Sequence, residues 1–182
     1  PGLGWAGWRG VEDLPRDLVV NGSYLGGEMP TFALNFSRPG AQVLLQYYMF
    51  LRLGFDGYRR VQEDAHNVAL YLSSHIADMD DFTLWNNGSD IPVFAWMLTP
   101  RADRAWSLYD LQDRLRMKGW LVPAYPMPAN LQDITVQRIV VRNGFSHDLA
   151  DSFLEDMHDA VDYLNSLTAP MPSESRASGF HH

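Results

Sequence analysis

The stretch Ser37-Arg38-Pro39-Gly40 brings together a hydroxyl group, a forked cation and a proline that suits the first turn of a helix. A helix N-terminus presents free N–H groups and a positive dipole end, so a serine and an arginine there suit a phosphate or a carboxylate. The same residues also suit an ordinary helix cap beside a solvated arginine, and their spacing alone favours the cap. Both interpretations stay open at this point.

Arg138 is the second candidate for anion binding. Alternation along "ITVQRIVVRNGF" (134–145) places Ile134, Val136, Arg138 and Val140 on one face of an expected strand. A guanidinium among β-branched residues of an interior strand is costly unless an anion pairs with it. The partner is either a carboxylate of this chain or a carboxylate of a ligand, and these two alternatives are balanced.

The remaining reactive residue types point to little chemistry of their own. Lys118 is the single lysine among 14 basic residues, and its place in the last turn before Gly119 favours a structural role at the helix end. An imine-forming lysine needs a desolvated position in a cleft. The histidines lack the spacing of metal ligands, and no Ser-His-Asp pattern or glycine-rich phosphate loop occurs.

The elements that must position these residues follow from hydrophobic periodicity and turn signals. They predict an α+β fold, with helices on one face of a small, largely antiparallel sheet. Turns are expected at Asn21-Gly22 and Gly26-Gly27, with two short strands around a mobile hairpin or loop that has Tyr24 and Leu25 at its tip. Further strands are expected at 5–10, 31–36, 82–85, 91–99, 120–124 and 134–141, and helices from Pro39 to Gly54, 56 to 79, 107 to 119 and 148 to 167.

Composition limits the classes of function. The chain has 182 residues, 46% of them hydrophobic, and a formal net charge of −8, so it carries no basic footprint for nucleic acid or anionic lipid. Its apolar runs are too short to span a bilayer, and no signal-peptide pattern opens the chain. The lack of cysteine excludes disulfides and fits a reducing compartment such as the cytoplasm. The opening "PGLGWAGWRG" has the pattern of a strand interior, which predicts that the chain is the C-terminal portion of a longer protein.

Three stretches carry a resemblance to a known family. "YLGGEMPTFALNFSRPGAQVLLQYYMFLRLGFDGYRRVQ", "LYDLQDRLRMKGWLVPAYPMP" and "QRIVVRNGFSHDLADSFLEDM" resemble segments of the glutamate decarboxylases of the bacterial and plant type. The similarity extends from Trp5 to about Leu167, and the hairpin with its NFSRP segment is specific to this group. An amino-acid-sensing regulatory module and a non-catalytic decarboxylase paralogue are the alternatives. The hairpin and NFSRP segments favour the decarboxylase, and an opening inside an expected strand, where Trp5 and Trp8 need neighbours, argues against the regulatory module.

The resemblance implies a fold-type I pyridoxal 5′-phosphate enzyme that converts L-glutamate to 4-aminobutyrate and CO2, uses up protons and so supports acid resistance. It implies a homo-oligomer, either a dimer or a hexamer. Residues 1–38 would be the end of the large cofactor-binding domain with the active-site hairpin. Residues 39–167 would be a linker helix and the C-terminal small domain, and 168–182 a flexible tail. The cofactor lysine would lie before Pro1, which leaves this chain inactive alone.

The resemblance also implies roles for individual residues. Ser37 would reach the cofactor phosphate of the neighbouring subunit, and Tyr24 and Leu25 would form the hairpin tip that closes over the partner's active site at acid pH. Arg138 would hold the α-carboxylate of the substrate. His182 would be the regulatory residue of the tail, which blocks the cofactor at neutral pH.

Overall fold

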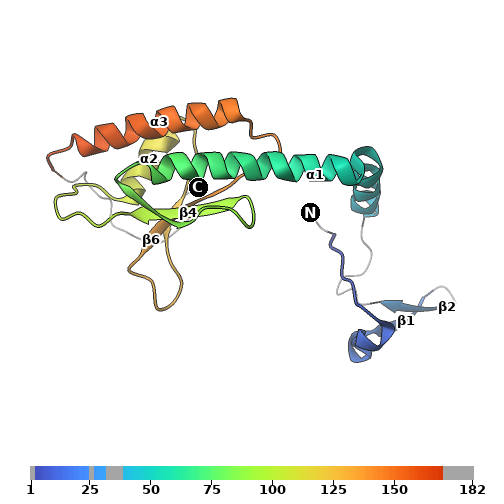
Figure 1. Ribbon diagram of the computed structural model, residues 1–182. Helices are drawn as coiled ribbons and strands as arrows, with labels where there is room; N and C mark the ends of the chain where they lie inside the picture. The colour runs from blue at the N-terminus through green and yellow to red at the C-terminus, as the bar shows by residue number, and fades with distance from the viewer. Residues whose placement is uncertain (1–2, 25–26, 32–38, 170–182) are drawn as a thin grey trace. The chain divides into compact units, whose positions relative to one another are not determined.

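The computed structural model describes residues 3–24, 27–31 and 39–169, and the side chains of 3–21 and 39–169 (Figure 1). The chain divides into two compact units, Pro1–Tyr58 and Arg59–His182. The sequence predicts a division of the chain into the segments 1–38, 39–167 and 168–182. That division refers to the domains of the larger enzyme, and it stays a prediction. Within the described residues, no helix combines the length and the apolar character that a membrane span requires.

The first unit contains an antiparallel hairpin and two short helical turns. Strands β1 (Val20–Tyr24) and β2 (Gly27–Thr31) pair from Val20↔Thr31 to Tyr24↔Gly27, after the 3₁₀ turns Val11–Asp13 and Arg16–Leu18. The prediction of a turn at Asn21-Gly22 is wrong, because both residues lie inside β1 and pair with Pro30 and Met29.

The segment from Trp5 to Gly10 is not a strand, contrary to the prediction. Its alternation of large and small residues is typical of a strand, but a strand also needs a neighbour to complete its hydrogen bonds. Side chains hold the segment instead: the Trp5 indole N–H donates to Gln46 Oε1 at 2.6 Å, and the Gln46 amide donates to the Leu3 carbonyl at 3.3 Å. The Trp5 ring also meets the Phe50 ring edge-on at 6.2 Å.

Helix α1 (Ala41–Ala77) is interrupted at Gly54, where φ is 59° and ψ is −172°. This backbone conformation has a positive φ that glycine adopts without steric cost. The helix therefore consists of two helical segments that meet at Gly54. This agrees with the prediction that one helix ends at Gly54 and another begins near Asp56. The predicted strand 31–36 falls almost wholly outside the described residues.

The N-terminal segment of α1 exposes apolar side chains on all sides. A helix that is apolar around its whole circumference is normally buried in a larger structure. The exposed side chains are Val43, Leu44, Leu45, Tyr47, Tyr48, Met49, Phe50 and Leu51, and Phe55 just after Gly54 is exposed as well.

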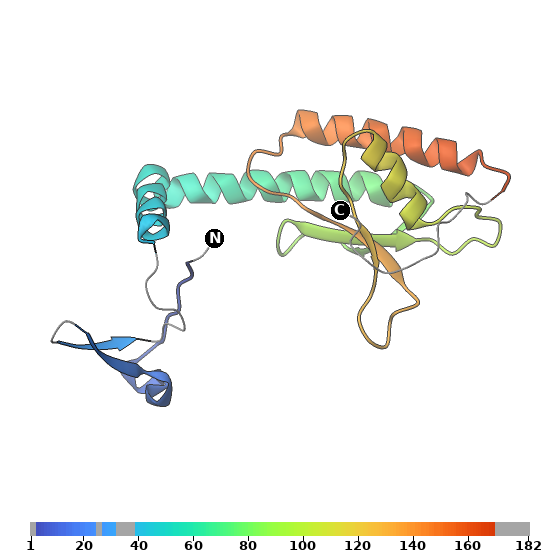
Figure 2. The same ribbon diagram turned by 180° about the vertical axis from the view of Figure 1, so that it is seen from behind.

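The second unit is an antiparallel sheet with helices on one side (Figures 1 and 2). The strand order is β3-β4-β6-β5, with β3 at Phe82–Asn86, β4 at Val93–Leu98, β5 at Ala124–Pro126 and β6 at Thr135–Val140. Helix α2 (Leu108–Met117), helix α3 (His147–Asn165) and the second segment of α1 cover one face. The predicted α+β class and its antiparallel sheet are confirmed.

The core lies between this sheet and its helices. Phe94 and Trp96 of β4 are fully buried and stack with ring centroids 5.7 Å apart. They meet the fully buried apolar side chains of the helices, which are Leu72 and Ile76 of α1, Leu111 and Leu115 of α2, and Met157 and Leu164 of α3.

A buried polar network links three separated parts of the second unit. Asp81, just before β3, accepts hydrogen bonds from Arg104 Nη2 at 2.7 Å and from the Asn165 amide at 2.8 Å. Asn165 Oδ1 in turn accepts from the Trp106 indole N–H at 2.8 Å, and the Arg104 guanidinium lies over the Trp106 ring. The end of α1, the loop before α2 and the end of α3 are therefore held at one carboxylate.

Candidate functional site

Arg138 lies on β6, an interior strand of the sheet, and its side chain is exposed on the face away from the helices. Gln137 of β6 and Val141, just after the strand, are buried on the helix side, with Gln137 paired to Ala124 of the core. Alternation therefore puts Arg138 on the opposite face together with Val136 and Val140. The predicted strand and the predicted face are both confirmed.

The expectation that Arg138 must pair with an anion rested on burial, and its exposure removes that requirement. Among the described residues, no carboxylate lies within ion-pair distance of the Arg138 guanidinium. Of the two alternatives left open by the sequence, the carboxylate of this chain is thus not observed. The fork of N–H donors stays available for a ligand carboxylate, which it can bind through two parallel hydrogen bonds.

Two neighbours define the surroundings of Arg138 on this face. Ala95 of β4 lies directly opposite Arg138, and its short side chain leaves space on that side. Tyr125 of β5 lies on the other side, with its ring centroid 5.8 Å from the guanidinium carbon. The site is therefore a cation on a small sheet face, with an aromatic ring on one flank and open space on the other.

Lys118 does not offer a reactive amine. It is the C-terminal cap of α2, and its Nζ lies 3.0 Å from Asp156 Oδ1 and 3.9 Å from Asp159 Oδ2 on α3. The hydrogen bond to Asp156 and the negative charge of that carboxylate raise the pKa of the Lys118 amine. An amine must lose its proton before it attacks a carbonyl, so this environment opposes imine formation. The predicted structural role of Lys118 agrees with this ion pair.

Asp156 also ties α3 to the segment that follows α2, because its Oδ2 accepts a hydrogen bond from the Trp120 indole N–H at 2.8 Å. That hydrogen bond lowers the pKa of the Asp156 carboxyl group most, and the hydrogen bond from Lys118 lowers it further. The lysine and its partner carboxylate are thus both stabilised in their charged forms. A pyridoxal group that requires a neutral lysine amine does not fit the lysine of this chain.

The other predicted site residues lie outside what the structure describes. Ser37, Leu25 and His182 belong to the segments beyond the described ranges, and of Tyr24 only the backbone, at the end of β1, is described. Among the described residues, no group of three or more histidines and carboxylates has the arrangement of a metal site.

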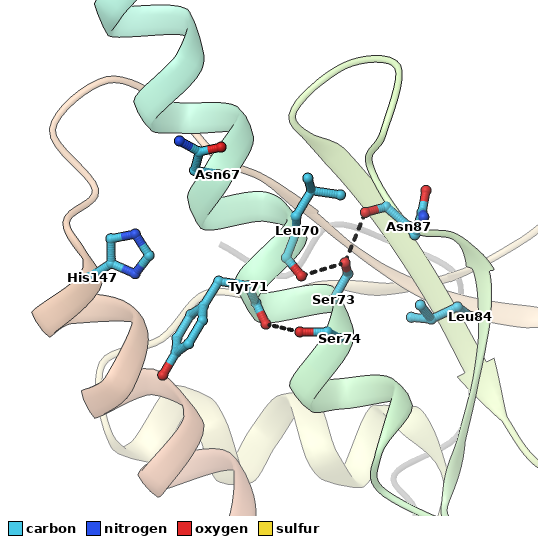
Figure 3. Close-up of a pocket in the computed structure, with 8 residues that line it drawn as sticks. All are labelled: Asn67, Leu70, Tyr71, Ser73, Ser74, Leu84, Asn87 and His147. Carbon is cyan, nitrogen blue, oxygen red and sulfur yellow. Dashed lines mark hydrogen bonds between the residues drawn. The ribbon is translucent and has the colours of Figure 1, made fainter.

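A hollow of about 660 Å³ lies on the helix side of the second unit, among α1, the β3–β4 segment and the start of α3 (Figure 3). Its polar groups are largely engaged within the protein: Ser73 Oγ donates to the Asn87 carbonyl at 2.8 Å, and Ser74 Oγ to the Tyr71 carbonyl at 2.8 Å. The Tyr71 hydroxyl donates to Asp151 Oδ1 at 2.6 Å, which raises the pKa of Tyr71. Neither Arg138 nor Lys118 lines this hollow.

Sequence reasoning missed Tyr125 as a neighbour of Arg138. The expected strand 120–124 ends before this residue, whereas β5 runs from Ala124 to Pro126. The signal was present in Pro126, because proline in a sheet is typical of an edge strand and β5 is an edge strand. The register that brings Tyr125 beside Arg138 could not be read from either strand alone.

Comparison with known proteins identifies the family. Residues 2–98 match the model of the pyridoxal-dependent decarboxylase conserved domain. The chain is 44% identical over its whole length to the glutamate decarboxylases of Lactococcus lactis subsp. cremoris and Aliivibrio fischeri, of which it covers 40% and 39%. The structure of the Lactobacillus brevis glutamate decarboxylase overlaps 88% of this chain and 36% of that protein, with 48% identity and a TM-score of 0.80.

The chain thus spans about two fifths of the length of the relatives that it matches. The family match covers more than half of the chain, and the solved structure extends the likeness to the second unit that carries Arg138. The resemblance seen in the sequence and the α+β fold agree with both findings. This chain belongs to the pyridoxal-dependent decarboxylase family.

Proposed function

We propose that the protein containing this chain is a glutamate decarboxylase, which converts L-glutamate to 4-aminobutyrate and CO2 with pyridoxal 5′-phosphate. The observation that carries the proposal is Arg138, an exposed guanidinium on an interior strand that meets no carboxylate among the described residues. The identity of 44% to glutamate decarboxylases over the whole chain supports the choice of substrate.

In the proposed reaction the bond between Cα and the α-carboxyl carbon breaks, CO2 leaves, and Cα takes up one proton. The pyridoxal group, when bound, supplies an electron sink for the electron pair left at Cα. Arg138 contributes by binding the α-carboxylate through its forked N–H donors and so fixing the orientation of the bond that breaks. Each turnover consumes one proton, which supports a role in acid resistance.

This chain would supply Arg138, which binds the α-carboxylate of the substrate. The cofactor lysine would come from another part of the complete enzyme. Lys118 is unsuited to that role because two carboxylates on α3 hold its amine in the charged form. We therefore propose that this chain alone does not catalyse decarboxylation.

The complete enzyme is proposed to be a cytoplasmic homo-oligomer, a dimer or a hexamer. The exposed apolar side chains around the N-terminal segment of α1 support burial of that segment in a larger assembly. Within such an assembly, Ser37 is proposed to contact the cofactor phosphate of the neighbouring subunit. Tyr24 and Leu25 are proposed to form the closing hairpin tip, and His182 is proposed to regulate access to the cofactor.

Replacing Lys118 tests whether the cofactor lysine is Lys118 or, as proposed, a lysine in another part of the complete enzyme. In the complete enzyme, Lys118→Arg is expected to leave CO2 release from L-glutamate and the visible cofactor absorbance unchanged, because arginine keeps the charge at the α2 C-terminus and the pairing with Asp156. The measurement is CO2 release together with the absorbance spectrum. Loss of the cofactor band in the variant would assign the imine to Lys118, and a wild-type enzyme that binds the cofactor but releases no CO2 from glutamate would refute the proposed function.

A further inference from the structure

Tyr125 and Arg138 lie on the same face of the sheet because of the register of β5 and β6. Tyr125 is paired with Val136, and Ala124 with Gln137, so Tyr125 shares the face of Val136 and Arg138. Tyr125 is then the diagonal neighbour of Arg138, a spacing that aromatic and long side chains can bridge.

The contact between the two side chains has the geometry of a cation–π interaction. The guanidinium carbon of Arg138 lies over the Tyr125 ring, 5.8 Å from its centroid, within the distance at which the ring quadrupole attracts a cation. Within the described residues, the Tyr125 hydroxyl makes no hydrogen bond and the Arg138 guanidinium donates none. The aromatic face is therefore the observed partner of the cation.

The two side chains differ in how firmly they are held. Tyr125 is half-buried beside Val136, which is buried, whereas the long Arg138 side chain is exposed and has Ala95 on its other flank. An unrestrained arginine side chain loses considerable rotamer freedom when a ligand fixes it. A fixed ring on one side and a short side chain on the other limit where the guanidinium can lie.

We propose that Tyr125 is a positioning residue that holds the Arg138 guanidinium in place for the carboxylate of the substrate. This inference rests on the proposed function. The ring attracts one face of the planar guanidinium, while the N–H donors lie along its edges and stay free for a carboxylate. A cation that is already in position costs less entropy to order when the substrate binds.

Two other roles for Tyr125 make different demands on its ring. If the residue only covers Val136, any apolar side chain of similar size will serve. If its hydroxyl group contacts the substrate, phenylalanine will fail. Positioning through the aromatic face requires an electron-rich ring but not the hydroxyl group.

The test uses the complete enzyme loaded with pyridoxal 5′-phosphate and two readouts. One is the split between KM and kcat for L-glutamate. The other is the Kd of glutarate, the substrate skeleton without its amino group, measured by titration calorimetry. Tyr125→Phe is expected to leave both within about twofold of wild type. Tyr125→Leu is expected to raise KM and the glutarate Kd by roughly three- to thirtyfold, the range that cation–π attraction spans, with a smaller change in kcat.

A third variant controls for any loss of stability that Tyr125→Leu causes. Pentafluorophenylalanine in place of Tyr125 keeps the shape of the ring but removes the negative potential of its face. It is expected to weaken glutarate binding relative to Tyr125→Phe at an unchanged thermal midpoint. Equal glutarate affinity in these two ring variants would overturn the inference, as would equal losses in Tyr125→Phe and Tyr125→Leu.

Arg138→Ala separates failure of this inference from failure of the proposed function. If Arg138→Ala weakens glutarate binding while all Tyr125 variants bind it as wild type does, the carboxylate anchor stands and the positioning role is wrong. If Arg138→Ala itself leaves glutarate binding and kcat/KM unchanged, the proposed role of the arginine fails, and with it the role of Tyr125.

Discussion

Arg138→Ala in the complete enzyme is expected to lower kcat/KM for L-glutamate by roughly 100- to 1,000-fold. If Arg138 has the proposed role, the variant loses two hydrogen bonds to the substrate carboxylate, each contributing about 1.5–2 kcal/mol. Tenfold in a rate or binding constant corresponds to about 1.4 kcal/mol. Exposure of Arg138 on the sheet face means that the fold itself loses little, so the thermal midpoint should stay near that of wild type.

The charge and the shape of Arg138 can be separated with a second substitution. Arg138→Lys keeps the cation but loses the forked donors, so we expect an intermediate loss of kcat/KM. Arg142→Ala is the matched control, because Arg142 is exposed just beyond the end of β6. Its kcat/KM should stay within about twofold of wild type. An Arg138→Ala enzyme as active as the Arg142→Ala enzyme would exclude the carboxylate role.

Asp81→Ala is expected to reduce the free energy of unfolding of this chain by about 3–5 kcal/mol, the cost of breaking a buried ion pair by removing one partner. The Asp81 side chain is 9% exposed and that of Arg104 is 6% exposed, with 2.7 Å between Asp81 Oδ1 and Arg104 Nη2. Without the carboxylate, the Arg104 charge and the Asn165 amide lose the acceptor that they share.

Urea unfolding followed by tryptophan fluorescence measures this loss. Asp103→Ala is the matched control, because Asp103 is 77% exposed and its carboxylate contacts Arg101 at 3.5 Å. An exposed pair of this kind contributes about 1 kcal/mol at most. If Asp81→Ala destabilises the chain no more than Asp103→Ala, then Asp81 does not hold the three elements together.

The contribution of Asp81 to the free energy of unfolding depends on pH through the pKa of its carboxyl group. Burial alone would raise the pKa of Asp81. Its effect is outweighed by the hydrogen bonds from Arg104 and Asn165 and by the positive charges of Arg104 and Arg101. The pKa of Asp81 is therefore lowered from its ordinary value of 3.8. The stabilisation is therefore complete above that ordinary value and is lost as the pH falls through the lowered pKa of the folded chain. The stability difference between wild type and Asp81→Asn should shrink only in that acid range.

Local rules predicted much of the second unit. The backbone N–H of Ser107 donates to Asp110 Oδ2 at 2.7 Å, and this capping box starts α2 at the residue where the sequence predicts a helix to begin. Gly54 breaks α1 because its positive φ is available to glycine. Alternation placed Arg138 on the correct face of β6, since a period of two depends on the strand alone.

Features that depend on distant contacts could not be predicted in this way. Trp120 reads as part of a strand, but it precedes β5 and packs against Phe153 of α3, with ring centroids 5.4 Å apart. The proximity of Tyr125 to Arg138 depends on strand register, and the convergence of Arg104 and Asn165 on Asp81 depends on the packing of three elements. The exposure of Arg138 likewise follows from which sheet face the helices cover.

The most direct test of the account is a chimera that joins this chain to the N-terminal remainder of the Lactobacillus brevis glutamate decarboxylase at the matching position. The measurement is CO2 release from carboxyl-labelled L-glutamate, with cofactor absorbance as the check on loading and the chimera with Arg138→Ala as control. We predict that the chimera binds pyridoxal 5′-phosphate and releases CO2, and that neither part does so alone. A chimera that binds the cofactor but releases no CO2 from glutamate would contradict the assignment of this chain to a glutamate decarboxylase.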